Sequence, residues 1–424
     1  MAEPSQRRVT VLPGGRALPP RGLYLALAAI QGFAMYAMFI TYGVYVVREA
    51  GLDPLQLVLA GTALEAAVFI AEIPTGVVAD VYSRRLSMII GLTVSGVGFA
   101  LMGASPTFLW IAGGQAVWGV GWTFISGAQQ AWLADEVGEA DAAPIYLRAT
   151  QLTQVARLLA IPVGVAIASR SLQLPYFFAA AIHGALVVLL MLTMAERGFA
   201  PAARGERSTW SALGSTLRAG LGAVRGRPTL LTILVIAVLY GASSEATDRL
   251  GSLLLLDVIG LPDALDEVVW FGVIGAVALL GGIAVTGLAG RAVESGDPRP
   301  IVGTLLALTA VLTGASFVFA FTTSIWLAIG AYWVAQWVRI AIDPLTLIWL
   351  NRGLDPASRA TVLSMLGQSD ALGQTAGGPV LGLIGTLRTV RAALTAVGVI
   401  LLPTLALYAR ELSRRQPSER PPAS

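Results

Sequence analysis

Residues 76–85 read GVVADVYSRR, and this short polar break separates two long apolar runs. One run extends over about residues 56–79 and the other over about residues 86–104. The length of each run is close to the roughly 20 helical residues that are needed to cross a hydrocarbon core of about 30 Å. Because backbone groups in lipid must bond within their own segment, we expect both runs to be transmembrane helices.

Similar apolar runs recur along almost the whole chain. Of its 424 residues, 56% are hydrophobic and 12% are charged, a composition that soluble domains do not have. The mean hydropathy is +0.74. We therefore predict an all-α integral membrane protein with twelve spans, at residues 23–47, 56–79, 86–104, 107–132, 146–168, 175–195, 229–256, 268–288, 301–321, 324–349, 361–386 and 392–409.

The longest polar break divides these spans into two groups of six. It carries six arginines and is predicted to be a central cytoplasmic loop. The expected parts are an N-terminal tail, a six-helix bundle, the loop, a second six-helix bundle and a C-terminal tail, at residues 1–21, 22–195, 196–228, 229–410 and 411–424.

The predicted central loop allows two interpretations. Trp210, Leu213, Leu217 and Leu221 recur at helical intervals, as in an amphipathic helix that lies on the inner leaflet. An ordinary solvated linker fits the same composition.

The arginines predict the orientation of the chain, because all 28 basic residues are arginine. With the N-terminal tail inside, 21 of them lie at cytoplasmic positions, three lie within spans, and four lie outside, namely Arg48, Arg170, Arg388 and Arg391. This bias predicts a protein of the inner membrane with both termini in the cytoplasm. The basic charge then follows from topology, so we expect no nucleic-acid partner. The absence of cysteine excludes disulfides and thiolate metal sites.

Charged residues within the spans gather on particular helices. They occur in the second, fifth, seventh, tenth and eleventh spans, as Glu65, Glu72, Arg157, Glu245, Asp248, Arg249, Arg339, Asp343 and Asp370. A charge inside the membrane costs at least a few kcal/mol, so these helices should line a cavity or a helix interface. Within one helix, Glu245 could neutralise Arg249, and Arg339 could neutralise Asp343, because each pair is four residues apart.

Four of these residues are candidates for proton coupling, namely Glu65, Glu72, Asp370 and Arg157. Glu65 and Glu72 are seven residues apart and so lie on one helix face. A carboxyl group in an apolar span can take up and release a proton, because burial disfavours its charged form. The alternative is a set of permanent ion pairs that hold helices together. For His183 we favour a packing role over a proton relay.

The fourth and tenth spans carry similar groups of tryptophan and glutamine. These tryptophans lie too deep for an interfacial aromatic belt. They could form aromatic walls for a lipophilic or cationic cargo, or they could simply pack helices together. With the charged residues of the seventh and tenth spans they make up the predicted substrate cavity, which consists of Gln115, Trp118, Trp122, Glu245, Asp248, Arg249, Trp333, Gln336, Trp337 and Arg339.

The break at residues 76–85 resembles the loop signature of the major facilitator superfamily, Gly-x-x-x-Asp-(Arg/Lys)-x-Gly-(Arg/Lys)-(Arg/Lys). The signature is matched at Gly76, Asp80, Arg84 and Arg85, while Val81 and Ser83 depart from it. We expect the four matching residues to form a cytoplasmic gate, in which a carboxylate and a guanidinium join the two halves in one conformation only. The alternative is that their charge only sets the topology.

Further stretches resemble the tetracycline- and macrolide-efflux-like branch of drug:proton antiporters in that superfamily. They include residues 72–76, 243–249 and 359–364. The fourth span departs from the pattern of proton-coupled exporters, because Gln115 and Trp118 stand in the places of its arginine and glutamine. This departure argues against proton antiport through the usual arginine.

Taken with the resemblance, the sequence predicts a monomeric secondary transporter with alternating access. We expect it to export a small, moderately lipophilic compound, driven by protons, in contact with membrane lipids and without a cofactor. The first and fourth spans hold no ionised residue, which favours drug-like cargo. No Walker loop or nucleophile–base arrangement is present in the sequence, so we expect no enzyme. Metabolite uptake remains an alternative, as does a membrane sensor or assembly factor that transports nothing.

Overall fold

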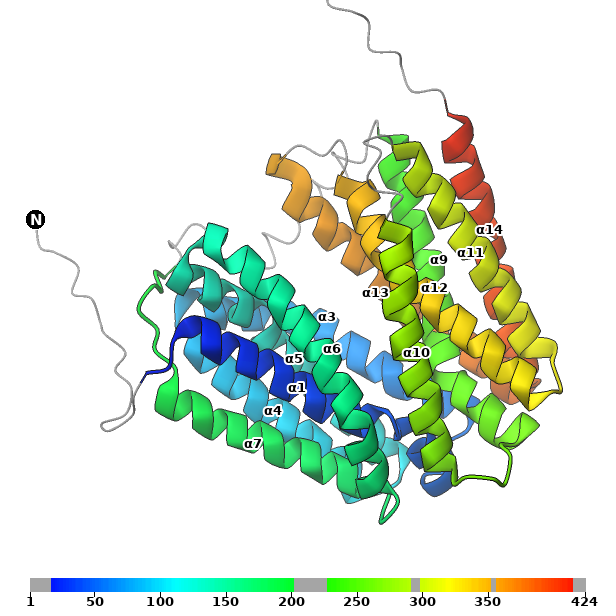
Figure 1. Ribbon diagram of the computed structural model, residues 1–424, viewed down its shortest axis with the longest axis horizontal. Coiled ribbons are helices and arrows are strands. Elements are labelled where there is room, and N and C mark those ends of the chain that lie inside the picture. The colour runs from blue at the N-terminus through cyan, green and yellow to red at the C-terminus, as the bar shows by residue number, and fades with distance from the viewer. Residues whose placement is uncertain (1–16, 202–226, 291–297, 352–355, 415–424) are drawn as a thin grey trace, which may run out of the picture. The chain divides into compact units, whose positions relative to one another are not determined.

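The computed structural model describes residues 17–201, 227–290, 298–351 and 356–414, and the regular structure within these ranges is helical (Figure 1). The possible amphipathic helix at residues 208–224 lies outside them, as does most of the predicted N-terminal tail. The described ranges hold twelve helices of 20 or more residues. These are α1 (Pro20–Phe39), α3 (Pro54–Val81), α4 (Arg84–Ala104), α5 (Phe108–Val137), α6 (Glu139–Ala168), α7 (Leu174–Thr193), α9 (Pro228–Leu253), α10 (Glu267–Ala289), α11 (Pro298–Phe321), α12 (Ile325–Asn351), α13 (Pro356–Leu387) and α14 (Val390–Ser413).

Two of the predicted spans end in wider helical turns. The short helix α2 (Tyr42–Val44) and the π-helix η1 (Tyr45–Glu49) follow α1, and the π-helix η2 (Leu254–Ile259) follows α9. The first and seventh spans therefore extend as far as Glu49 and Ile259. Such π-turns arise where the regular i→i−4 ladder is interrupted.

Eleven helices in the described ranges are long and apolar enough to cross a membrane, which makes the chain a multi-pass membrane protein. The helix α13, predicted as the eleventh span, has 32 residues but is not among them. Its polar residues Gln368, Asp370 and Gln374 lower its hydropathy. Helix α6 begins at Glu139, seven residues before the predicted span. Its first two turns are polar, so the apolar pattern of the sequence does not include them.

Contacts divide the chain into two compact units, residues 1–216 with 261–276, and residues 217–260 with 277–424. The division falls inside α10, whose first part belongs to the first unit.

Glycines bring α4 and α5 together in the first unit. A Cβ added to Gly98 would lie 2.6 Å from the backbone nitrogen of Trp118. At Gly121 it would lie 2.6 Å from the backbone nitrogen of Ser95. Because a larger residue would have to displace backbone, these two helices pack more closely than larger side chains allow.

Glycines also allow the close packing of α9 against α13 in the second unit. A Cβ added to Gly241 would overlap the backbone carbonyl of Asp370, and one added to Gly373 would overlap that of Val238. This close approach places Asp370 of α13 beside the segment of α9 that contains Tyr240.

Candidate functional site

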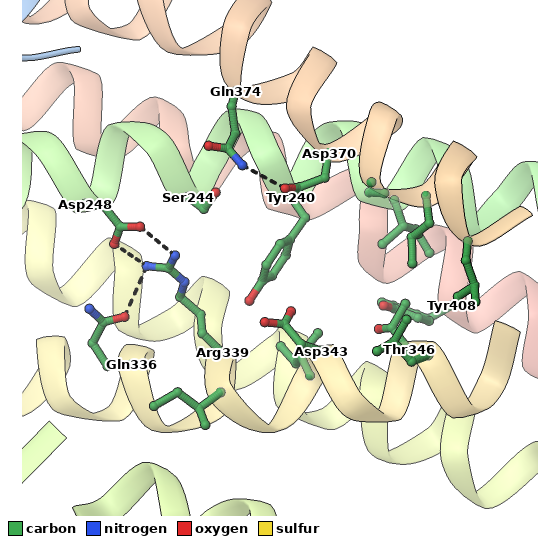
Figure 2. Close-up of a pocket in the computed structure, with 18 residues that line it drawn as sticks. Tyr240, Ser244, Asp248, Gln336, Arg339, Asp343, Thr346, Asp370, Gln374 and Tyr408 are labelled. Atoms are coloured by element: carbon green, nitrogen blue, oxygen red, sulfur yellow. Dashed lines mark hydrogen bonds and ion pairs between the residues drawn. The ribbon is translucent and has the colours of Figure 1, made fainter. Parts of the chain in front are cut away.

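The second unit contains a cavity of about 550 Å³ between α9, α12, α13 and α14 (Figure 2). Apolar and polar side chains share its lining. The polar ones are Tyr240, Ser244, Asp248, Gln336, Arg339, Asp343, Thr346, Asp370, Gln374 and Tyr408.

Helical periodicity explains why these side chains face one space. On α9, Tyr240, Ser244 and Asp248 are separated by four residues each, so they lie on one face. On α12 the polar lining residues recur at intervals of three and four, from Gln336 to Thr346. Each helix therefore presents one polar stripe to the cavity.

Arg339 makes a two-pronged contact across the cavity from α12 to α9. One guanidinium nitrogen, Nη1, donates to Asp248 Oδ1 at 2.6 Å, and Nη2 donates to Asp248 Oδ2 at 2.8 Å. The same Nη1 also donates to Gln336 Oε1 at 3.1 Å. The suggested pairing of Arg339 with Asp343 is wrong for the described residues, because the long arginine side chain reaches the neighbouring helix and meets a carboxylate in bidentate geometry.

The other two cavity carboxylates are bound less completely. Asp370 accepts a hydrogen bond from Gln374 Nε2 at 2.7 Å. Asp343 has no hydrogen bond or ion pair within the described part of the chain, although the charges of Arg339 and Asp370 act on it. Figure 2 shows the Tyr240 ring reaching from α9 into the space near Arg339 and Asp343. Its hydroxyl is enclosed and lies next to the guanidinium of Arg339, although not in a hydrogen bond of regular geometry.

The remaining predicted cavity residues of the second unit lie outside this lining. Glu245 and Arg249 form the expected ion pair along α9, at 3.0 Å, and both side chains are nearly buried. Trp337 donates to the carbonyl of Val277 at 3.0 Å, and its ring stacks on Trp333 with centroids 6.5 Å apart. These contacts pack Trp337 against α10 and against Trp333, while a role of the pair in cargo binding stays a prediction.

In the first unit, Trp118 is buried, and its ring lies 5.3 Å from the ring of Phe39 and 5.7 Å from that of Phe99. Gln115 is fully buried, and neither of its amide atoms has a hydrogen-bond partner. Trp122 is 41% exposed. None of these residues lines the cavity of the second unit.

Of the proton-coupling candidates, Asp370 alone lines this cavity. Glu65 is half-buried on α3, and Glu72 is exposed on the same helix. The guanidinium of Arg157 lies 5.9 Å from the ring centre of Tyr36, a cation–π contact between α6 and α1. The buried ring of His183 bonds to the carbonyl of Ala179 at 2.9 Å, as expected of a packing residue.

The predicted gate residues form a local network in the first unit. Arg84 pairs with Asp80 on the preceding helix, and its Nε lies 3.5 Å from Asp135 Oδ2 at the end of α5. The Nη2 atom of Arg85 donates to the carbonyl of Met191 at 2.7 Å. Nothing within 4 Å would meet a Cβ added to Gly76. The described contacts thus join α3, α4, α5 and α7, and the gate itself stays a prediction.

Sequence reasoning missed Glu196, which holds the beginning of α4. Its carboxylate accepts hydrogen bonds from Ser83 Oγ at 2.6 Å and from the backbone nitrogens of Arg84 and Arg85 at 2.5 and 3.2 Å. Ser83, in turn, accepts from the backbone nitrogen of Leu86 at 3.0 Å and caps the helix. The only sequence signal for this contact is an acid that lies 112 residues after Arg84, the first of the two arginines at the start of α4.

Asp343, Tyr240, Ser244, Thr346, Gln374 and Tyr408 were not among the predicted site residues. The stripe of polar residues at helical spacing on α9 and α12 could have identified most of them. Tyr408 lies on α14 without such a stripe, and only the fold brings it to the cavity.

Comparisons with known proteins agree with this fold. The sequence matches the profile of the Major Facilitator Superfamily over residues 24–333. It is 20% identical to the uncharacterized MFS-type transporter YxaM of Bacillus subtilis (strain 168), over 91% of this chain and 94% of that protein.

Two solved structures share the fold across their whole length. A mutant of the nucleoside transporter NupG superposes with a TM-score of 0.76 at 15% identity, covering 93% of this chain and 99% of that one. A bacterial homologue of the human lysosomal transporter Spinster, in an inward-facing and unoccupied conformation, gives a TM-score of 0.75 at 15% identity, with 95% and 100% covered. Since the family profile covers well over half of the chain, this protein belongs to the Major Facilitator Superfamily and is a membrane transporter of that type.

Proposed function

We propose that this protein is a secondary active transporter that exports a small, moderately lipophilic compound by alternating access, driven by the proton gradient. The observation that carries the proposal is the cavity of about 550 Å³ among membrane helices. Its size lies within the range of about 300–1,000 Å³ that is usual for small-molecule sites. Its lining combines apolar side chains with a few charged ones, as a site for an amphipathic cargo requires.

The export direction rests on the resemblance of residues 72–76 and 243–249 to the tetracycline- and macrolide-efflux-like branch. The proposal includes two six-helix bundles that open alternately to the two sides of the inner membrane. The excess of arginine at the predicted cytoplasmic positions supports cytoplasmic termini. We propose that the protein works as a monomer.

Proton coupling is assigned to the acids within the spans. Asp370 is favoured by its position in the cavity lining, where cargo could act on its charge directly. Glu72 and Glu65 on α3 and Arg157 on α6 are the further candidates.

Uptake of a polar metabolite is the second candidate function, since the charged lining of the cavity would also accept a polar cargo. Two structural relatives are a nucleoside transporter and a homologue of a lysosomal transporter, so the fold is compatible with several cargo classes. The direction of flux separates export from uptake.

Inverted membrane vesicles with an acidified interior provide the test. We expect compounds that are cargo to accumulate inside and to release protons from the vesicles, and Asp370→Asn to abolish the proton release more than the binding, with Glu72→Gln and Glu65→Gln as the next variants. Trypsin added outside should cut the arginine-rich termini if both are cytoplasmic.

Two outcomes would contradict the proposal. Accumulation only in right-side-out vesicles would support uptake. Unchanged proton release in the triple variant Glu65→Gln, Glu72→Gln, Asp370→Asn would exclude coupling through these acids.

A further inference from the structure

The cavity of the second unit carries more negative than positive charge. Its lining holds three carboxylates, on Asp248, Asp343 and Asp370, and one guanidinium, on Arg339. With all four groups ionised the formal charge of the lining is −2. Electrostatic forces are stronger in an apolar surrounding than in water, so this imbalance favours a ligand that brings positive charge.

Hydrogen bonds show which carboxylate is available to such a ligand. Arg339 directs both terminal nitrogens at Asp248, so this carboxylate is neutralised by its partner. Asp370 is engaged by Gln374 through one oxygen. Asp343 makes no hydrogen bond or ion pair with any described residue, and its carboxylate is open to the cavity. Asp343 is therefore the carboxylate best placed to meet a ligand charge.

A second, independent feature also points to a ligand in this space. The side chain of Tyr240 lines the cavity, and its enclosed hydroxyl lies next to the guanidinium of Arg339. In Figure 2 it is directed toward the region between Arg339 and Asp343. A cation bound in this region would meet the carboxylate of Asp343, and its charge would also face the ring of Tyr240.

The cavity suits an organic cation better than a metal ion. No group of three or more metal-ligating side chains is placed to hold a metal within the ranges that the structure covers. Much of the lining is apolar, including Ile236, Ile340 and Leu363. A cargo with an apolar body and one charged centre would satisfy both parts of the lining.

We propose that the cargo is a lipophilic organic cation and that Asp343 is its main counter-charge. This inference rests on the proposed transport function and names the substrate class of the same site. In this arrangement Arg339 does not bind the cargo. Its guanidinium neutralises Asp248. The hydrogen bond to Gln336 helps to hold the guanidinium in this position.

The test uses two ions of nearly equal size and opposite charge, tetraphenylphosphonium and tetraphenylborate. Binding to the purified full-length protein in detergent is measured by equilibrium dialysis, and micelles without protein give the background. We expect the phosphonium ion to bind at least about tenfold more tightly than the borate ion. Equal or reversed affinities would overturn the cation class.

Variants then locate the site. Asp343→Asn should weaken phosphonium binding about tenfold or more, whereas Asp343→Glu, which keeps the charge, should retain most of it. Asp263→Asn is the matched control, because Asp263 is exposed in the segment before α10 and does not line the cavity. Unchanged binding in Asp343→Asn would overturn the assignment. The wild-type selectivity between the two ions remains decisive if a variant fails to fold.

The two levels of the proposal can fail separately. If the wild-type protein binds neither ion but transports another compound in inverted vesicles, the cation class is wrong and the transport function stands. If it binds the phosphonium ion through Asp343 but moves no cargo in either direction, the site stands and the transport function is wrong.

Discussion

One charged cluster of the first unit and one of the second unit lie at different places along their helices. In the first unit, Arg84 lies at the beginning of α4 and meets Asp80 and Asp135 near the ends of α3 and α5. In the second unit, Arg339 and Asp343 lie in the middle of α12 and face a cavity. Charges at helix ends remain near water and head groups, while charges in mid-helix lie at the depth of the hydrocarbon core, where an ionised group is costly. The first set can therefore be explained by structure, whereas the second calls for a function.

This contrast is sharpest for two acids, Glu196 and Asp343. Glu196 is buried and accepts three hydrogen bonds at the beginning of α4. Asp343 accepts none from the described residues. One acid should therefore support the fold, and the other should be dispensable for it.

The largest effect on stability is expected from Glu196→Ala. Each hydrogen bond to a charged group is worth about 1.5–3 kcal/mol, and the variant also leaves two backbone nitrogens at the start of α4 without their partner. The apparent unfolding temperature of the purified protein in detergent should fall by several degrees. Differential scanning fluorimetry would measure the fall.

Glu139→Ala is the control for this prediction, since Glu139 is exposed in the first turn of α6. It should change the unfolding temperature much less. If Glu196→Ala is as stable as this control, the carboxylate does not stabilise the beginning of α4. The structural role that we assign to Glu196 would then be wrong.

An effect of opposite sign is expected for Asp343→Asn. The charge of Asp343 lies within an apolar span without a partner among the described residues, although it is exposed to the cavity, so removing it should raise the free energy of unfolding only slightly, by up to about 1 kcal/mol, while phosphonium binding falls. The unfolding temperature without ligand measures the first effect. A clear loss of stability would mean that Asp343 has a structural role, and it would remove the distinction between mid-helix and helix-end charges.

Sequence reasoning predicted the helices well, because the hydrophobic runs are set by the membrane and not by tertiary contacts. It placed α4 and α9 within a few residues of their observed ends. It could not predict which charged groups meet. The spacing of Arg339 and Asp343 permits a pair on one helix, but the guanidinium reaches Asp248, 91 residues away in the sequence.

The segment that follows α7 illustrates the same limit. Glu196 stands at the start of a predicted loop, where an acid normally faces solvent, and no local pattern signals its bond to Ser83. By contrast, Glu245 and Arg249 pair as their spacing suggests, because both ends of that contact lie on one helix. Local contacts can be predicted from periodicity, whereas contacts between helices need the fold.

The smallest effect on stability is expected from Asp80→Asn, which nevertheless should change transport. A partly exposed ion pair contributes about 0.2–1 kcal/mol, and Arg84 keeps Asp135 as a partner, so the unfolding temperature should hardly move. If Asp80 latches the cytoplasmic side in the outward-facing state, its loss removes a contact of about 1.5–3 kcal/mol from that state alone and shifts a balanced equilibrium roughly 10- to 150-fold toward the inward-facing form. Cargo accumulation in inverted vesicles should then fall although the protein folds and inserts.

The control variant is Asp141→Asn, at an exposed position of α6, which should leave transport unchanged. Normal transport in Asp80→Asn would reduce the segment at residues 76–85 to charge that only sets the topology.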